Sequence, residues 1–248
     1  MKLTSIKAQL IIFLVGFAIF LSIRDKELKF LLTMLIAVVV AIGIESLIAY
    51  LKNKKFALSE SSIISGLIIG YVISSDQPWW IFASVSLLAI ASKYLIRRNK
   101  KHLFNPAGFG IFSVILLFNA STQWKGTYAW YILIPFGLYF IIKIKKIELL
   151  LSYIVTTLLI FVIQAVIQKT PIFNIFGYLS FFYIFIMLIE PTTTPIKPFG
   201  KIIFGICAAV LIFILTEAGI KFDAELAALL ILNLFVPLLN KLPEGRLI

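Results

Sequence analysis

A few charged side chains interrupt the long apolar segments of this chain, and they are the first candidates for chemistry. Lys93 lies inside one apolar segment, and Glu190 ends another. A charge within an apolar segment is costly unless it is paired or hydrated, and Lys93 is an available partner for Glu190. Alternatively, the Lys93 side chain extends to a polar boundary, although Arg97 and its basic neighbours already crowd that boundary. Glu45 also lies within an apolar segment but belongs to no motif, so we expect it at the membrane interface.

Hydroxyl and amide groups occur where two further segments begin or end. Thr192, Thr193 and Thr194 lie between two prolines, which have no backbone N–H. Their hydroxyls can hydrogen-bond a polar ligand, or the triplet can form no more than a rigid turn. Asn105 followed by Pro106 is typical of a helix start with Asn105 as the N-cap. The free N–H groups at such a start suit carbonyl or phosphate oxygens.

The stretch from Ser61 to Ser75 predicts a helix that is too short to cross a bilayer. As a helix it spans about 22 Å, whereas the hydrocarbon core of a bilayer is roughly 30 Å thick. Ser62, Gly66 and Gly70 recur at four-residue spacing, which allows another backbone to approach closely. A short helix, a polar break and a new helix start at Asn105 together indicate a binding site at membrane depth.

The composition assigns the chain to the integral membrane proteins, so its surroundings are a lipid bilayer. Of its 248 residues, 61% are hydrophobic and 14% are charged, which no soluble domain of this length matches. The net charge of +12 comes from short basic clusters between apolar segments, a pattern that sets topology and does not indicate nucleic acid binding. The single cysteine, Cys207, excludes an internal disulfide and an iron–sulfur cluster held by this chain alone. The single histidine, His102, excludes a haem with two histidine ligands.

Ten apolar segments follow one another with short connections, so residues 1–248 are expected to form one all-α transmembrane domain. The segments cover residues 6–23, 30–51, 61–75, 79–96, 106–119, 127–142, 147–168, 174–189, 199–216 and 224–240. Sixteen Lys and Arg residues occur at the chain ends and in alternate connections, and six occur in the other connections. This bias predicts a multi-pass protein of the inner (plasma) membrane with cytoplasmic N- and C-termini.

The two halves of the chain resemble each other. Residues 104–119 (FNPAGFGIFSVILLFN) and 222–237 (FDAELAALLILNLFVP) align at a constant offset of 118 positions. A polar break precedes each of them, SSDQP at 74–78 and EPTTTPIKP at 190–198. Five helices per half is an odd number, so we expect two inverted repeats, about 1–120 and 121–248, with short discontinuous helices. Such repeats place a site near the midplane; chance similarity between apolar sequences is the alternative.

Four motifs, in this order along the chain, resemble those of the RnfD/NqrB family. These proteins are the integral membrane subunits of the Rnf and sodium-pumping NADH:quinone oxidoreductase complexes. Together the matching stretches cover about residues 59–119 and 174–240. The motifs are a short helix with Ser65–Leu67 that ends at Pro78–Trp80, Lys93 followed by Phe104–Ala107, the turn Glu190–Pro195, and Asn233 with Pro237–Leu238.

The resemblance implies a membrane subunit of a flavin-dependent electron transport system that couples electron transfer to ion movement. Its partners would be other redox subunits or a soluble flavin or NADH reductase. Family members usually carry Ser-Gly-Ala-Thr in an outer connection, where the Thr is esterified with FMN. Here that connection, Asn119–Thr127, lacks the motif, so a flavin (riboflavin or FMN) is expected to bind non-covalently. The residues nominated for its site are Ser62, Ser65, Lys93, Asn105, Glu190, Thr192 and Thr194.

Two further interpretations come from other functional classes. The family's fold is similar to that of urea transporters, so a small-solute or flavin transporter or channel is the alternative, and it would use the same site. A scaffold subunit without a ligand is the third interpretation, and the charges at depth and the two polar breaks argue against it. The sequence contains no nicotinamide motif, so the chain is not expected to be catalytic alone.

Overall fold

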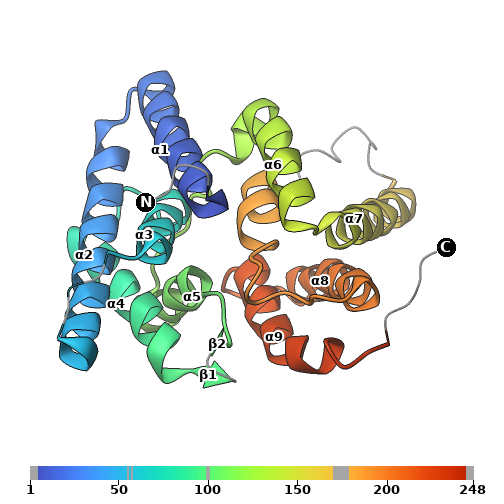
Figure 1. Cartoon of the computed structure of the whole chain (residues 1–248). Helices are drawn as coiled ribbons and strands as arrows, with labels where there is room; N and C mark the ends of the chain where they lie inside the picture. Colours follow the sequence, from blue (N-terminus) through green and yellow to red (C-terminus); the bar gives the residue numbers. More distant parts are fainter. Residues whose placement is uncertain (1–4, 55, 57, 99–100, 170–178, 244–248) are drawn as a thin grey trace. The chain divides into compact units, whose positions relative to one another are not determined.

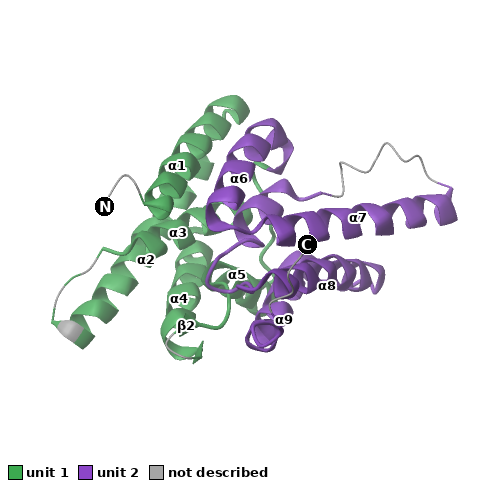
Figure 2. Cartoon of the chain, turned by 45° about the vertical axis from the view of Figure 1, so that its right-hand side comes forward, with its two compact units in different colours: residues 1–126 green, residues 127–248 purple. Residues whose placement is uncertain are grey.

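A computed structural model describes residues 5–54, 56, 58–98, 101–169 and 179–243 of the chain. The chain divides into two compact units, residues 1–126 and residues 127–248, which are described separately below (Figures 1 and 2).

Unit 1 is built from α-helices and one very small β-hairpin. The prediction of a short helix at Ser61–Ser75 is confirmed, because the helix there has only 13 residues and ends at Val72. The hairpin is a minor departure from the all-α prediction, and its strands pair Arg97 with His102 and Arg98 with Lys101. The elements are α1 (Ile6–Asp25), α2 (Leu28–Asn53), α3 (Glu60–Val72), α4 (Trp79–Leu95), β1 (Arg97–Arg98), β2 (Lys101–His102) and α5 (Pro106–Phe118).

The short helix α3 packs closely on α2 because it carries two glycines on the contact face. A Cβ atom on Gly66 would lie 2.5 Å from the Cα of Val38, and a Cβ on Gly70 would lie 2.6 Å from the Cβ of Met34. Neither position has room for a side chain. The small-residue spacing therefore serves the packing of two helices, as such spacing commonly does in membranes.

Helices α2 and α4 run in the same direction side by side (Figure 1). The Ser86 hydroxyl of α4 donates to the carbonyl oxygen of Ala37 in α2 at 3.0 Å. About two helical turns further along both helices, Lys93 lies beside Glu45. The constant register of these two contacts means that the carboxyl ends of α2 and α4 lie at the same end of unit 1.

Unit 2 contains a second set of helices. Two helices of 15 and 22 residues come first, then a short buried helical segment at residues 181–187 that contains a π-helical stretch, and then two helices of 20 and 16 residues. Of the predicted segment 174–189, residues 174–178 lie outside the described residues. The elements are η1 (Thr127–Ala129), α6 (Trp130–Ile144), α7 (Ile147–Gln168), η3 (Tyr183–Met187), α8 (Pro198–Glu217) and α9 (Ala224–Leu239).

Helices α7 and α8 repeat in unit 2 the parallel arrangement of α2 and α4 (Figure 2). Lys201 of α8 pairs with Glu148 at the start of α7, at 3.1 Å. At the other end, Gln164 donates to Glu217 at 2.8 Å. Both contacts span 53 residues, so the amino ends of the two helices lie together.

The chain is a multi-pass membrane protein. Among the described residues, five helices are long and apolar enough to cross a membrane: α1, α2, α6 with the preceding η1, α7 and α8. The apolar helices α3, α4, α5 and α9 are shorter, between 13 and 17 residues. Many of the apolar side chains on the long helices are exposed, including Leu35, Val39, Leu159 and Ile163, as expected for surfaces that face lipid.

Candidate functional site

The buried charges of unit 1 form an ion pair between α2 and α4. The Nζ of Lys93 lies 2.5 Å from Oε2 of Glu45, and the Tyr94 hydroxyl donates to Oε1 of Glu45 at 3.1 Å. Lys93 is 7% exposed and Glu45 is 8% exposed. A carboxylate inside a membrane protein needs such partners, because its charge is costly in an apolar environment.

The structure gives these two charges a pairing that the sequence does not predict. Glu45, expected at the membrane interface, is buried within unit 1 and faces Lys93. The sequence offers Lys93 as a partner for Glu190, but the Lys93 ammonium is bound to Glu45 within unit 1. The reason is the register between α2 and α4, which brings together two residues that lie 48 positions apart. The expectation that Lys93 points inward is confirmed.

The serines of α3 are buried and are bonded within their own helix. The Ser62 hydroxyl donates to the Ser59 carbonyl at 2.8 Å, and the Ser65 hydroxyl donates to the Ser61 carbonyl at 3.0 Å. Such bonds satisfy the hydroxyl donor locally and leave the oxygen as an acceptor. Ser62 and Ser65 can therefore accept a hydrogen bond from a ligand.

Asn105 caps α5 as the sequence predicts. Its Oδ1 accepts a hydrogen bond from the Gly108 N–H at 2.9 Å, and the residue is buried. In unit 2, Asp223 caps α9 in the same way, with Oδ1 accepting from the Leu226 N–H at 3.0 Å. The two helix starts that align in the sequence thus have the same local structure, because both rest on a short side chain with an oxygen at the N-cap.

The turn that connects η3 to α8 is a compact polar structure centred on Glu190. The Thr193 hydroxyl donates to Oε2 of Glu190 at 2.9 Å, and the Thr194 hydroxyl donates to the Glu190 carbonyl at 2.7 Å. Thr193 and Thr194 are buried, whereas Thr192 is exposed. Glu190, Thr192 and Thr194, all nominated from the sequence, therefore lie on one turn. We call residues Glu190–Pro195 the Glu190 turn.

Two side chains from other elements hold the Glu190 turn in place. Asn233 of α9 donates from Nδ2 to the Thr193 carbonyl at 2.9 Å. Lys146, which precedes α7, donates from Nζ to the Pro195 carbonyl at 2.6 Å and to the Thr194 carbonyl at 3.4 Å. The two prolines of the turn remove backbone donors, so its carbonyls need donors from elsewhere.

Lys146 is the functional candidate that the sequence does not reveal. In the sequence it is one lysine of a basic loop, yet in the structure it is 4% exposed. Burial, and then the charge of nearby Lys201, lower the pKa of Lys146 from 10.5 to about 8, and the Glu148 carboxylate opposes the shift only in part. A weak sequence signal exists, because Lys146 comes directly before the first residue of α7, a position where a cation opposes the helix dipole.

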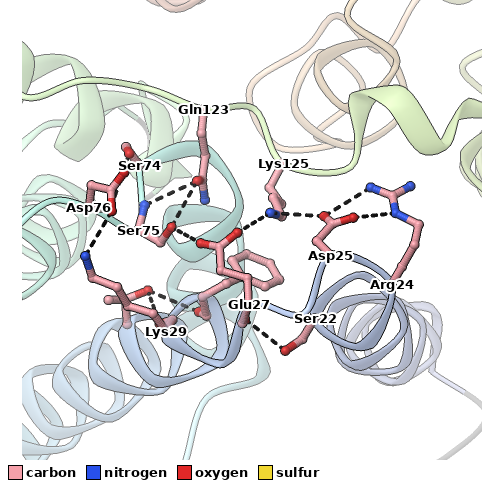
Figure 3. A network of polar contacts seen from close by, with 12 residues as sticks. Ser22, Arg24, Asp25, Glu27, Lys29, Ser74, Ser75, Asp76, Gln123 and Lys125 are labelled. Carbon is pink, nitrogen blue, oxygen red and sulfur yellow. Dashed lines mark hydrogen bonds and ion pairs between the residues drawn. The ribbon is translucent and has the colours of Figure 1, made fainter.

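A second polar cluster joins three connections at one end of unit 1 (Figure 3). The Lys125 ammonium lies 3.0 Å from Oδ2 of Asp25 and 2.5 Å from Oε2 of Glu27. The other carboxylate oxygen of Glu27 accepts from the Ser75 hydroxyl. The cluster thereby ties the connection before α2 to the connection before α4 and to the segment after α5.

Electrostatics favour the charged forms in this cluster. Burial tends to raise the pKa of Glu27, but hydrogen bonds from Lys125 and Ser75, together with the Lys125 charge, lower it overall. Burial likewise tends to lower the pKa of Lys125, but its bonds to Glu27 and Asp25 and their charges raise it overall. The pair is thus stabilised in its ionised form at neutral pH.

The connection after α5 is held against α3 by backbone hydrogen bonds. The N–H of Gln123 donates to the Val72 carbonyl at 2.8 Å, and the N–H of Lys125 donates to the Tyr71 carbonyl at 2.7 Å. The hydroxyl oxygen of Thr127 is buried. The backbone of residues 123–125 is therefore fixed against the end of α3.

Thr192 and Thr194 of the Glu190 turn differ in exposure and in hydrogen-bonding capacity. The exposed Thr192 hydroxyl can donate. The Thr194 hydroxyl gives its proton to the Glu190 carbonyl, so its oxygen can only accept. The two threonines thus offer complementary functions within one turn.

Comparison with known proteins identifies the family of the chain. Residues 1–131 and 115–247 match the family model described as the NQR2, RnfD, RnfE family. A protein of Aeromonas hydrophila subsp. hydrophila, named as a subunit of the ion-translocating oxidoreductase complex, is 29% identical over 77 residues, which are 31% of this chain and 22% of that protein. The similarity thus spans a minor part of that curated relative's length. Because the family model matches both halves of the chain, the chain belongs to the NQR2, RnfD, RnfE family.

Proposed function

We propose that this chain is a membrane subunit of an ion-translocating electron transport complex. The observation that carries the proposal is the match of the family model to residues 1–131 and 115–247. The similarity to a protein named as part of an ion-translocating oxidoreductase complex supports it. The partners of this chain are then other redox subunits or a soluble flavin or NADH reductase, because a single membrane subunit receives its electrons from elsewhere.

The site for the cofactor is proposed at the Glu190 turn. A flavin held there without a covalent bond would accept and pass on single electrons. Thr192 and the oxygen of Thr194 would orient its ring edge, and Lys146 and Asn233 would keep the turn in position. Ser62, Ser65, Lys93 and Asn105, the other residues proposed for the cofactor, belong to unit 1.

Ion coupling is proposed to involve the Lys93–Glu45 pair. Ionisable residues inside membrane proteins are rare and mark ion or proton pathways. The pair is buried between two helices and is completed by the Tyr94 hydroxyl. A change of charge near the pair would shift the equilibrium between its paired and unpaired states. Coupling requires an element with two such states.

The proposed topology has ten crossings in two inverted repeats, with both termini cytoplasmic in the inner membrane. The positions of the ion pairs support it. Lys93 and Glu45 lie near the carboxyl ends of α4 and α2, whereas Lys201 and Glu148 lie near the amino ends of α8 and α7. If the second repeat is inverted, both pairs come to the same, basic side of the membrane.

The test is the absorption spectrum of the full chain purified in mild detergent. The expected result is a flavin spectrum near one flavin per chain, and no fluorescent protein band after denaturing electrophoresis. Absence of flavin, together with uptake of a solute into vesicles that contain the protein, would instead indicate the transporter of urea-transporter-like fold. A fluorescent band that disappears in Thr122→Val or Thr127→Val would show a covalent flavin and contradict the non-covalent site.

A further inference from the structure

Two cations lie over one aromatic ring at the carboxyl ends of α2 and α4. The Nζ of Lys52 is 4.6 Å from the centroid of the Tyr94 ring, and the Cζ of Arg97 is 4.7 Å from the same centroid. Lys52 and Arg97 are both exposed. We call Tyr94, Lys52 and Arg97 the Tyr94 platform. Cation–π contacts thus hold both cations beside the same ring.

The carboxylate that contacts the Tyr94 platform belongs to Glu45. It accepts a hydrogen bond from the Tyr94 hydroxyl and is already paired with Lys93. Arg97 donates from Nε to the Lys93 carbonyl, which orients the guanidinium without cancelling its charge. Within the described parts of the chain, no ion pair joins Lys52 or Arg97 to an Asp or Glu.

The basic surface continues beyond the Tyr94 platform. The hairpin that follows α4 pairs Arg98 with Lys101, and both side chains are exposed. Lys54 follows Lys52 at the end of α2 and is also exposed. The dipoles of α2 and α4 favour cations at these carboxyl ends, which accounts for some positive charge. They do not account for two cations held beside one ring.

Apolar side chains border the Tyr94 platform on both helices. Leu51 of α2 is 64% exposed, and Leu95 of α4 is 81% exposed, each directly beside a residue of the platform in the sequence. Cations that adjoin exposed leucines at the end of apolar helices lie at the level where headgroups meet acyl chains. A soluble anion would make no use of the leucines, whereas a lipid would use both features.

We propose that the Tyr94 platform binds the phosphate of an anionic phospholipid, with Lys52 and Arg97 as its two charged ligands and Leu51 and Leu95 against the acyl chains. This site shares no residue with the Glu190 turn and does not depend on the function proposed above. The Tyr94 hydroxyl contacts Glu45. A lipid bound on the Tyr94 ring therefore also shields the Lys93–Glu45 pair from water.

The experiment compares the binding of phosphatidylglycerol and phosphatidylcholine to the full chain in detergent, measured by native mass spectrometry and by the shift in melting temperature. We expect wild-type protein to prefer phosphatidylglycerol. Removing one platform charge should reduce that preference about fivefold, the equivalent of ~1 kcal/mol per Lys or Arg near an anionic surface. The double variant Lys52→Gln/Arg97→Gln should therefore lose most of the preference for phosphatidylglycerol.

Two variants control for general effects of charge and folding. Lys26→Gln/Lys29→Gln removes two exposed cations near the opposite end of α2 and should keep the preference. Lys52→Arg/Arg97→Lys keeps both charges and should also keep it. Equal loss in the two Gln pairs would show a non-specific charge effect and overturn the proposal.

The melting temperature also distinguishes a lipid phosphate from free inorganic phosphate. If inorganic phosphate alone raises the melting temperature as much as phosphatidylglycerol does, the ligand is a soluble anion and the lipid assignment is wrong. No preference of the wild-type protein for phosphatidylglycerol over phosphatidylcholine would likewise overturn it. A preference that falls in Lys52→Gln/Arg97→Gln and weakens as salt is raised would support it.

Discussion

Lys93 and Glu45 form a buried ion pair, 2.5 Å from Nζ to Oε2, that joins α4 to α2 in unit 1. Lys201 and Glu148 join α8 to α7 in unit 2, at 3.1 Å. In each unit the acid lies on the first of two parallel helices and the lysine on the second. The pairs therefore link the same two elements of each unit, although they lie at opposite ends of those elements.

Replacing only one residue of the buried pair should strongly lower the free energy of unfolding. Glu45→Gln leaves the Lys93 ammonium buried without a counter-charge, and we expect a loss of about 3–5 kcal/mol in the free energy of unfolding. The double variant Glu45→Gln/Lys93→Met should lose less than either single variant. Thermal or denaturant unfolding in detergent measures the effect.

Asp76→Asn is the control, because the Lys29–Asp76 pair is exposed and its loss should cost about 1 kcal/mol or less. Similar losses in both pairs would contradict the burial argument.

The cluster around Lys125 should make stability fall in acid. The pKa of Glu27 is lowered in the folded protein, so its contribution is present above about pH 4.5, the usual value for Glu, and is lost as the pH falls through the lower folded value. The pKa of Lys125 is raised, so its contribution is lost at high pH, above 10.5. The melting temperature of Glu27→Gln should lie below wild type at pH 7 and approach it near pH 3. A constant difference over this range would show that Glu27 does not act through its charge.

Lys146 should make stability rise in alkali. Its pKa is lowered to about 8 in the folded protein, against 10.5 when unfolded, so the unfolded chain binds more protons between these values. Stability therefore increases from pH 8 towards 10.5, by at most about 3 kcal/mol at 1.36 kcal/mol per pKa unit.

The variant Lys146→Met should lose this increase, which unfolding at pH 7.5 and pH 9.5 can measure. Lys143→Met, which removes an exposed lysine three residues earlier, serves as the control and should keep it. An increase of the same size in Lys146→Met would assign the alkaline effect to another group.

The proposed flavin site predicts loss of ligand without loss of fold. Asn105→Ala removes a helix cap worth about 1 kcal/mol, which is too little to unfold the protein. Thr194→Ala removes a hydroxyl of the Glu190 turn. Both variants should keep a melting temperature near that of wild type and contain less flavin. Thr216→Ala is a matched control, because the Thr216 hydroxyl also donates to a backbone carbonyl, that of Ile212 at 2.8 Å, but on an exposed surface. Wild-type flavin content in both site variants would remove the main physical support for the site.

The distribution of basic residues predicts which ends of the helices face the cytoplasm. In a Cys207→Ala background, Lys101→Cys in the hairpin should react with a membrane-impermeant thiol reagent only after cells are opened. Lys169→Cys, after the end of α7, should react in intact cells. Both side chains are exposed, so accessibility is limited by the membrane alone. Labelling of Lys101→Cys in intact cells would reverse the proposed orientation.

Local features of this protein can be predicted from its sequence. The starts of α5 and α9 are recognisable because an N-cap oxygen followed by a helix is a property of neighbouring residues. The shortness of α3 and its glycine contact face are recognisable for the same reason. The apolar segments follow from hydropathy, since the bilayer imposes the same requirement on every crossing.

Only the tertiary structure decided which polar groups meet. Lys93 is bound to Glu45 because α2 and α4 run parallel in one register, and no local pattern specifies that register. Thr192 is exposed, while Thr193 and Thr194 are buried. Lys146 lies in a basic loop, but its side chain is buried and donates to the Pro195 carbonyl. Helix formation depends on neighbours in the chain, but burial and pairing depend on residues about 50 positions away, whose approach is set by the packing of whole helices.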